Sequence, residues 1–186
     1  MDSSIIITFA IPLFFGLILI EFFYGVLTKQ NNYRINDAIT SMSLGLISRF
    51  VPILGLGFQY VVYKAVAEHY NFNLLNGEEV WVWVTAFILY DVCYYWMHRI
   101  HHEIKVFWAT HVVHHHGEEF NLSTALRQTS TGFLWKWVFF LPMFIIGIPP
   151  HIYVSVAGLN LVYQFWVHTE HIGRLGFLEY IFVTPS

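Results

Sequence analysis

The sequence has few charged residues, one cysteine and no excess of positive charge. Charged residues make up 11% of the 186 residues, against about 25% in an ordinary globular protein, so the chain has too few charges to cover a water-soluble surface. Nine Lys and Arg against twelve Asp and Glu leave no basic surface for nucleic acid. The single cysteine, Cys93, excludes an intramolecular disulfide framework and a cysteine-rich zinc site.

Apolar residues dominate the composition instead. They make up 56% of the chain, aromatic residues make up 19%, and the mean hydropathy is +0.55, which excludes intrinsic disorder. A helix needs about 20 apolar residues to cross a bilayer. Long apolar stretches run over 5–27, 39–66 and 80–97, and shorter ones over 132–148 and 152–167. We therefore predict an all-α integral membrane helical bundle, with residues 1–186 as a single membrane domain.

Prolines and charges suggest how these segments are arranged. Pro52 interrupts the second segment, which we expect to kink or re-enter, and Pro149-Pro150 hinges the last two segments. Positive residues mark the cytoplasmic connections of membrane proteins. They fall in the connections 28–38, 98–131 and 168–186, and none falls in 67–79. We therefore predict a multi-pass protein with these three connections on the cytoplasmic face, and with 67–79 and 149–151 on the opposite face.

Histidines are concentrated in the polar stretch between the third and fourth segments. Seven of the eleven fall within 98–116, where an even spread would place about one. They are His98, His101, His102, His111, His114, His115 and His116. The spacing H-x3-H places His98 and His102 on one helical face, and H-x2-H-H does the same for His111, His114 and His115. Neutral imidazole is the commonest nitrogen ligand for zinc, iron and copper.

A histidine-rich stretch can also be a solvated surface or a set of rings at the membrane interface. Five rings at helical ligand spacing beside a membrane segment favour a metal site, formed on a membrane-surface helical region. His168 and His171 return to the same face and are further candidate ligands. The remaining histidines are assigned other roles: His69 and His151 a structural role on the opposite face, and His101 and His116 an orienting or solvent-facing role.

A charged residue inside an apolar segment needs a partner, and three such residues bear on the arrangement of the helices. Asp91 precedes His98 by seven residues. It either orients a ligand imidazole from behind the metal site or bonds a neighbouring helix, and the sequence leaves both options open. Glu21 and Arg49, on the first two segments, are expected to pair with each other.

Several runs resemble the fatty acid hydroxylase (sterol desaturase) superfamily. They are DVCYYWMHRIHH at 91–102, WATHVVHH at 108–115 and NLSTALRQ at 121–128. Within the superfamily, YRINDAIT at 33–40 and YQFWVHTE at 163–170 resemble the alkylglycerol monooxygenase subgroup. The resemblance covers most of the chain from about residue 30 onward, and the combined motifs are more specific than either histidine box alone.

The resemblance implies a membrane-bound, non-haem di-iron oxygenase that uses O2 to hydroxylate or desaturate a C–H bond of an ether lipid, a sterol or a fatty acyl chain. Such chemistry requires a cofactor, because side chains alone cannot oxidise an unactivated C–H bond. The subgroup also implies a reduced pterin as a possible electron donor. The metal ligands carried over from the family are His98, His102, His111, His114, His115 and His168, with His171 as an addition.

The family has a third box, H-x2-H-H, after a Thr-Pro-Ser sequence, and this chain ends at Thr184-Pro185-Ser186. We therefore expect a C-terminally incomplete member of the family. The alternative function is that of a non-catalytic membrane metal-binding protein, or an inactive remnant of such an enzyme. Imidazole ligands also suit zinc and copper, so the sequence leaves the identity of the metal open.

Overall fold

Every regular element of the described chain is helical, which confirms the predicted all-α class. The structure is a computed structural model that describes residues 3–54, 57–75, 77 and 79–185. Ser186, at which the Thr-Pro-Ser sequence ends, lies outside this part. The α-helices are α1 Ser3–Thr28, α2 Ile35–Leu54, α3 Phe58–His69, α4 Val80–Glu103, α5 Lys105–His115, α6 Lys136–Ile146 and α7 Pro150–Trp166. Short 3-10 helices lie at η1 Thr124–Leu126, η2 Gly132–Leu134 and η3 Gly176–Tyr180.

Two glycines and a proline pair set the helix boundaries. The predicted segment 39–66 divides into α2 and α3, and Gly57, with a left-handed φ of 67°, precedes α3. Gly147, with φ of 109°, ends α6. Glycine is favoured at both positions because it has no Cβ to clash. Pro150 then occupies the first position of α7, where its missing N–H removes no helical hydrogen bond, so the predicted hinge is confirmed.

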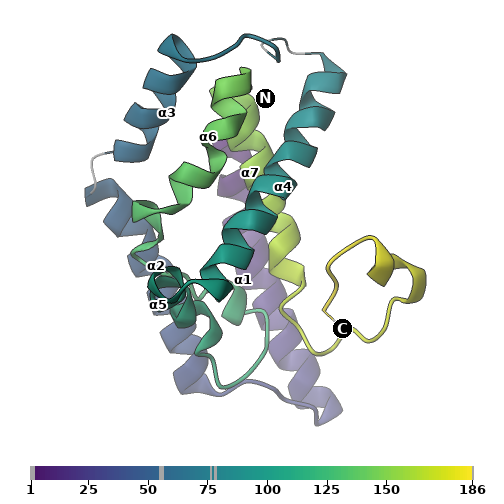
Figure 1. The fold of residues 1–186 in the computed structure, drawn as a ribbon. Helices are drawn as coiled ribbons and strands as arrows, with labels where there is room; N and C mark the ends of the chain where they lie inside the picture. Colours follow the sequence, from purple (N-terminus) through teal and green to yellow (C-terminus); the bar gives the residue numbers. More distant parts are fainter. Residues whose placement is uncertain (1–2, 55–56, 76, 78, 186) are drawn as a thin grey trace.

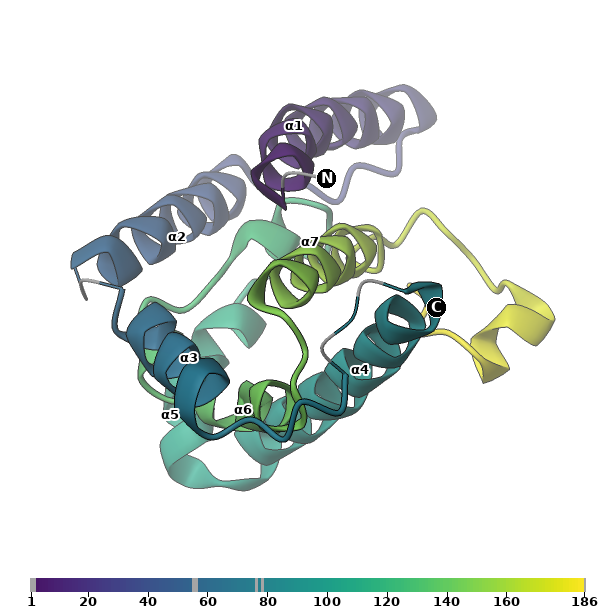
Figure 2. The same cartoon turned by 90° about the horizontal axis from the view of Figure 1, so that it is seen from above.

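The helices form a bundle in which α1, α7 and α4 lie side by side, α6 packs against α4, and α3 packs against α6 and α7 (Figures 1 and 2). One core lies between α4, α6 and α7, where Val82, Met143 and Ile152 are fully buried. A second core joins α1 to α7, where the rings of Phe14 and Phe165 stack 4.0 Å apart. These contacts fix α4 and α7 relative to each other.

Among the described residues, two helices are long and apolar enough to cross a membrane: Phe9–Thr28 within α1, and Val80–Glu103, which is α4. In each helix, less than a third of the residues in the apolar stretch are buried inside the bundle. Large apolar side chains such as Phe9, Leu19, Phe87 and Ile88 therefore face outward. A contiguous apolar exterior of this kind is stable in contact with lipid rather than water.

The connections gather at two ends of the bundle, in the grouping predicted from the charges. At one end, the 67–79 loop lies against the end of α6, because the amides of Phe72 and Leu74 donate to the carbonyls of Ile145 and Ile146 at 2.7 and 3.0 Å. At the other end, the side-chain amide of Asn121 donates to the carbonyl of Asn32 at 2.7 Å, and Arg34 pairs with Glu118 at 2.6 Å. His69 and His151 lie on α3 and α7 at the first end (Figure 1).

The predicted pairing of Glu21 with Arg49 is wrong. Glu21 is buried and accepts hydrogen bonds from the Leu122 amide at 2.8 Å and from the hydroxyls of Tyr33 and Thr169. Arg49 is exposed and makes no ion pair within the described ranges. The reason is geometric: Glu21 faces the loops beside α1, whereas Arg49 lies in the last turns of α2.

Candidate metal centre

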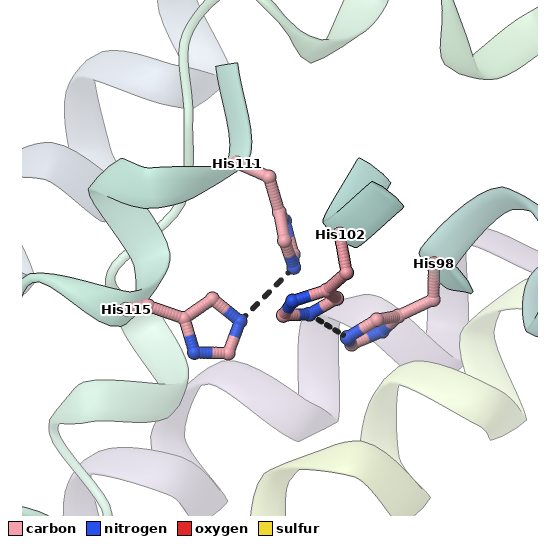
Figure 3. Close-up of side chains that lie close together, drawn as sticks. All are labelled: His98, His102, His111 and His115. Carbon is pink, nitrogen blue, oxygen red and sulfur yellow. Dashed lines mark hydrogen bonds between the residues drawn. The ribbon is translucent and has the colours of Figure 1, made fainter. Parts of the chain in front are cut away.

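One extended residue folds the two histidine boxes onto each other. Ile104, with φ of −106° and ψ of 123°, is the C-cap of α4 and the N-cap of α5. The chain therefore changes direction within a single residue, and α5 packs back against the end of α4. His98 and His102 project from α4 towards His111 and His115 on α5 (Figure 3).

These four imidazoles form a compact group of nitrogen donors. One ligand nitrogen from each ring lies within 4.8 Å of the others. The Nε2 atoms of His98 and His102 are 2.9 Å apart, and those of His111 and His115 are 3.1 Å apart. Metal–nitrogen bonds of about 2.0–2.1 Å place two neighbouring ligands about 2.9–3.4 Å apart. The spacing of the rings thus fits a shared metal ion, and the predicted convergence of these four histidines is confirmed.

His114 and His168 form a second donor pair beside the first group. Their Nε2 atoms are 3.3 Å apart, although they come from α5 and from the segment after α7. The Nδ1 of His114 donates to the Arg127 carbonyl and the Nδ1 of His168 donates to the Gln164 carbonyl, both at 2.8 Å. A hydrogen bond from Nδ1 to a carbonyl fixes the tautomer and leaves the Nε2 lone pair free for a metal.

Burial keeps these imidazoles uncharged near neutral pH. Desolvation by burial is the main cause that lowers the pKa of His114 and of His115 to about 4 each. Neighbouring imidazoles contribute to both values, and the charges of Lys136 and Arg127 contribute at His114 alone. Burial, and to a lesser extent the charge of His98, hold the pKa of His111 well below its usual range. Burial also lowers the pKa of His168. Only the neutral ring has a lone pair to offer a metal, so the rings whose pKa is lowered here are in the ligating form at pH 7.

His101 and His116 occupy different environments. His101 is 1% exposed, its Nδ1 donates to the Met97 carbonyl at 2.6 Å, and its Nε2 lacks a hydrogen-bond partner in the part of the chain that the structure describes. It lines an enclosed cavity of about 40 Å³ together with Lys136 and Gln128. A solvent-facing role is therefore excluded for His101, whereas His116 is exposed at the end of α5.

His171 and Asp91 lie apart from the group. The His171 ring packs edge-on against Tyr24, with centroids 5.1 Å apart. Asp91 is exposed on α4, and no hydrogen bond joins it to a ligand histidine within the described ranges. Backbone carbonyls orient the His114 and His168 rings instead, which residue types alone do not reveal.

A buried ion pair supports the carbonyl that orients His114. The Arg127 side chain is almost fully buried, pairs with the Asp37 carboxylate and donates from Nε to the Ser41 hydroxyl at 3.1 Å. These contacts fix η1 and its flanking residues on α2. The sequence predictions missed this role. The signal that could have found it is Arg127, a charged residue within the NLSTALRQ run.

An open cleft of about 230 Å³ leads to the second donor pair. Its lining combines imidazoles with acidic and aromatic side chains, namely His114, His115, His168, Glu118, Glu119, Glu170 and Phe120, together with Gly117 and Thr124. Arg34 pairs with Glu118 and Glu119 at 2.6 and 2.7 Å. The cleft gives a small polar molecule direct access to His114 and His168.

A family comparison accounts for this arrangement. The family model described as fatty acid hydroxylase matches residues 83–186, which include most of α4, both histidine boxes and His168. The chain belongs to the fatty acid hydroxylase family. This assignment confirms the predicted resemblance and agrees with a membrane-bound protein. The residues that converge in space are thus those in the matched region.

Curated relatives extend the similarity to almost the whole chain. It is 42% identical over 178 residues to an alkylglycerol monooxygenase of Danio rerio, and 40% identical over 178 residues to an alkylglycerol monooxygenase of Homo sapiens. Each alignment covers 95% of this chain and 40% of the relative. This member of the fatty acid hydroxylase family therefore spans about two-fifths of the length of these relatives. No solved structure matches the chain significantly.

Proposed function

We propose that the chain forms the metal-binding core of an O2-dependent lipid hydroxylase that oxidises an ether lipid at the carbon next to the ether oxygen. The observation behind the proposal is the convergence of four imidazoles from α4 and α5 in a chain similar to alkylglycerol monooxygenases. The family membership supports a lipid substrate, and the imidazole donors support a redox metal rather than a hard cation such as Mg²⁺.

The proposed cofactor is a pair of non-haem iron ions. His98, His102, His111 and His115 would hold one ion, and His114 and His168 would contribute to the second; His171 lies too far towards α1 to join them. When bound, iron supplies the activation of O2, which side chains cannot perform. The protein's own part is to hold uncharged rings in fixed orientations, through the carbonyls of Arg127 and Gln164.

The position of the site suits a lipid substrate. His98 and His102 lie in the last turns of α4, one of the two helices able to span a membrane. An alkyl chain can therefore approach along the apolar exterior of α4 without leaving the bilayer. One oxygen atom of O2 enters the lipid and the other leaves as water, so an electron donor must supply two electrons. We propose a reduced pterin as this donor, reaching the site through the polar cleft beside His114 and His168.

The proposed location is a multi-pass membrane protein with the histidine boxes on the cytoplasmic face. The two long apolar helices support membrane insertion. The positively charged connections support the orientation, because Lys and Arg are retained on the cytoplasmic side during insertion.

The test is metal content together with turnover of an alkylglycerol in lipid nanodiscs. We expect His111→Ala to remove most of the bound iron and all O2-dependent product. His116→Ala is the matched control: this ring is exposed at the end of the same helix, and iron and turnover should stay at the parent level. Bound iron without product in the parent chain would instead identify a non-catalytic metal-binding protein. Full turnover in iron-free protein would refute the mechanism.

A further inference from the structure

A single buried carboxylate joins three segments that are distant in sequence. Glu21, on the apolar helix α1, is 6% exposed. Its Oε2 accepts hydrogen bonds from the Leu122 amide at 2.8 Å and from the Tyr33 hydroxyl, and its Oε1 accepts one from the Thr169 hydroxyl. A charged group inside a membrane helix is retained only where it has a specific partner or function. Here all three partners are donors.

Two of these partners lie on the segments that flank His168. Thr169 follows it directly in the chain and is 5% exposed. Leu122 belongs to the loop that carries Phe120, whose ring packs against the His168 ring with centroids 5.6 Å apart. Glu21 therefore holds two neighbours of the His168 ring in place. One is Thr169, the next residue in the chain, and the other is the 120–122 loop, which packs against the ring through Phe120.

The short segment after α7 has few other supports. His168 lies beyond the last residue of α7, and its backbone amide donates a long hydrogen bond, of 3.3 Å, to the Phe165 carbonyl. The Thr169 hydroxyl also accepts from the His171 amide at 3.2 Å, so its hydrogen bond to Glu21 ties the backbone of 169–171 to α1. Burial and the Glu21 carboxylate raise the pKa of Tyr33, which therefore stays protonated as a donor.

We propose that Glu21 is a positioning residue for the second metal position, and that it acts on His168 through Thr169 and the 120–122 loop. This inference rests on the proposed function for its metal-binding consequence. It assigns a role in the metal site to a residue on α1, a helix that supplies no imidazole. The four-histidine group on α4 and α5 does not depend on this contact, so losing it affects one of the two positions.

The first test counts bound metal in the full chain in nanodiscs, with Co²⁺ as the probe. We expect Glu21→Leu to lower the count from two ions to one. Thr169→Val, which removes only the hydroxyl, should do the same, and Thr169→Ser, which keeps it, should hold two ions. Glu21→Gln should lie between, because its amide can satisfy Leu122 and Tyr33 but not accept from Thr169. Two ions in both Glu21→Leu and Thr169→Val would overturn the proposal.

A general loss of stability must be separated from a positioning effect. Met143→Ala removes a fully buried core side chain on α6, far from the site, and this destabilised control should still bind two ions. The second readout needs no metal: hydrogen–deuterium exchange in a peptide covering 165–172 should rise at least tenfold in Glu21→Leu and stay unchanged in Met143→Ala.

The two proposals fail in different ways. A parent chain that binds fewer than two ions would contradict the di-iron centre of the proposed function, and the exchange of the 165–172 peptide would then decide the role of Glu21 by itself. Unchanged exchange in Glu21→Leu would overturn that role, whatever the metal count of the parent.

Discussion

At the residue scale, desolvation and neighbouring charges lower the pKa of two of the clustered histidines, His114 and His115. A histidine in an unfolded chain titrates near 6.5, whereas His114 and His115 have a pKa of about 4 in the folded protein. Between these values the unfolded chain binds more protons than the folded chain. Protons therefore favour unfolding over this range, and a bound metal ion opposes them.

This difference predicts the pH dependence of the metal-free protein. Its stability should be fully present above about pH 6.5 and should fall as the pH decreases from about 6.5 to about 4, between the histidine pKa values of the unfolded and the folded chain. Thermal unfolding in detergent with a chelator measures the effect. His114→Gln should flatten the dependence, and His69→Gln, at the opposite end of the bundle, should leave it unchanged. A melting temperature that rises towards pH 5 would contradict the assignment.

At the scale of elements, the close approach of α2 to η1 sets the position of the Arg127 carbonyl. A Cβ on Gly45 would lie 2.4 Å from the backbone oxygen of Leu126, so glycine is required here for contact rather than for backbone freedom. The same interface contains the ion pair of Arg127 with Asp37. The packing of two elements that hold no ligand thereby orients His114.

Gly45→Ala should therefore push η1 away from α2. We expect a destabilisation of about 1–3 kcal/mol, as for other overpacked sites, together with weaker metal binding through the displaced carbonyl. Gly16→Ala is the matched control, because a Cβ at Gly16 meets nothing within 4 Å, and its stability should remain within about 1 kcal/mol of the parent. Chemical unfolding and Co²⁺ titration measure both quantities. Equal behaviour of the two variants would argue against the contact.

At the scale of the whole molecule, the bundle separates a histidine-bearing end from an end formed by the 67–79 loop and the α6–α7 turn. Between them, α1 and α4 present apolar side chains outward. Under the proposed function, this arrangement puts the histidine-bearing end at a membrane surface, where a lipid chain and a polar reductant would approach from different directions.

Accessibility labelling tests this orientation. Single cysteines at Glu68→Cys and His116→Cys, in a Cys93→Ser background, report on exposed positions at the two ends. In right-side-out membrane vesicles, we expect an impermeant maleimide to label the cysteine at position 68 from outside. The cysteine at position 116 should be labelled only after the vesicles are opened. Labelling of both from the same side would contradict a multi-pass topology with the histidine boxes on the cytoplasmic face.

The sequence by itself determined the helical class, the grouping of connections at two ends and the core of the metal site. Those features depend on short-range patterns: apolar length, proline position and the i, i+4 spacing of His98 with His102 and of His111 with His115. Local spacing fixes which rings share a helical face, so these predictions needed no knowledge of distant contacts.

Only the tertiary structure decided which distant groups complete the site. It joined His168 to His114, placed His171 against Tyr24 instead, and replaced the expected pairing of Glu21 with Arg49 by contacts to three loops. Each outcome depends on contacts between segments more than 50 residues apart, in which backbone groups such as the Leu122 amide take part. Every residue has the same backbone groups, so the sequence gives no sign of which of them will meet a given side chain.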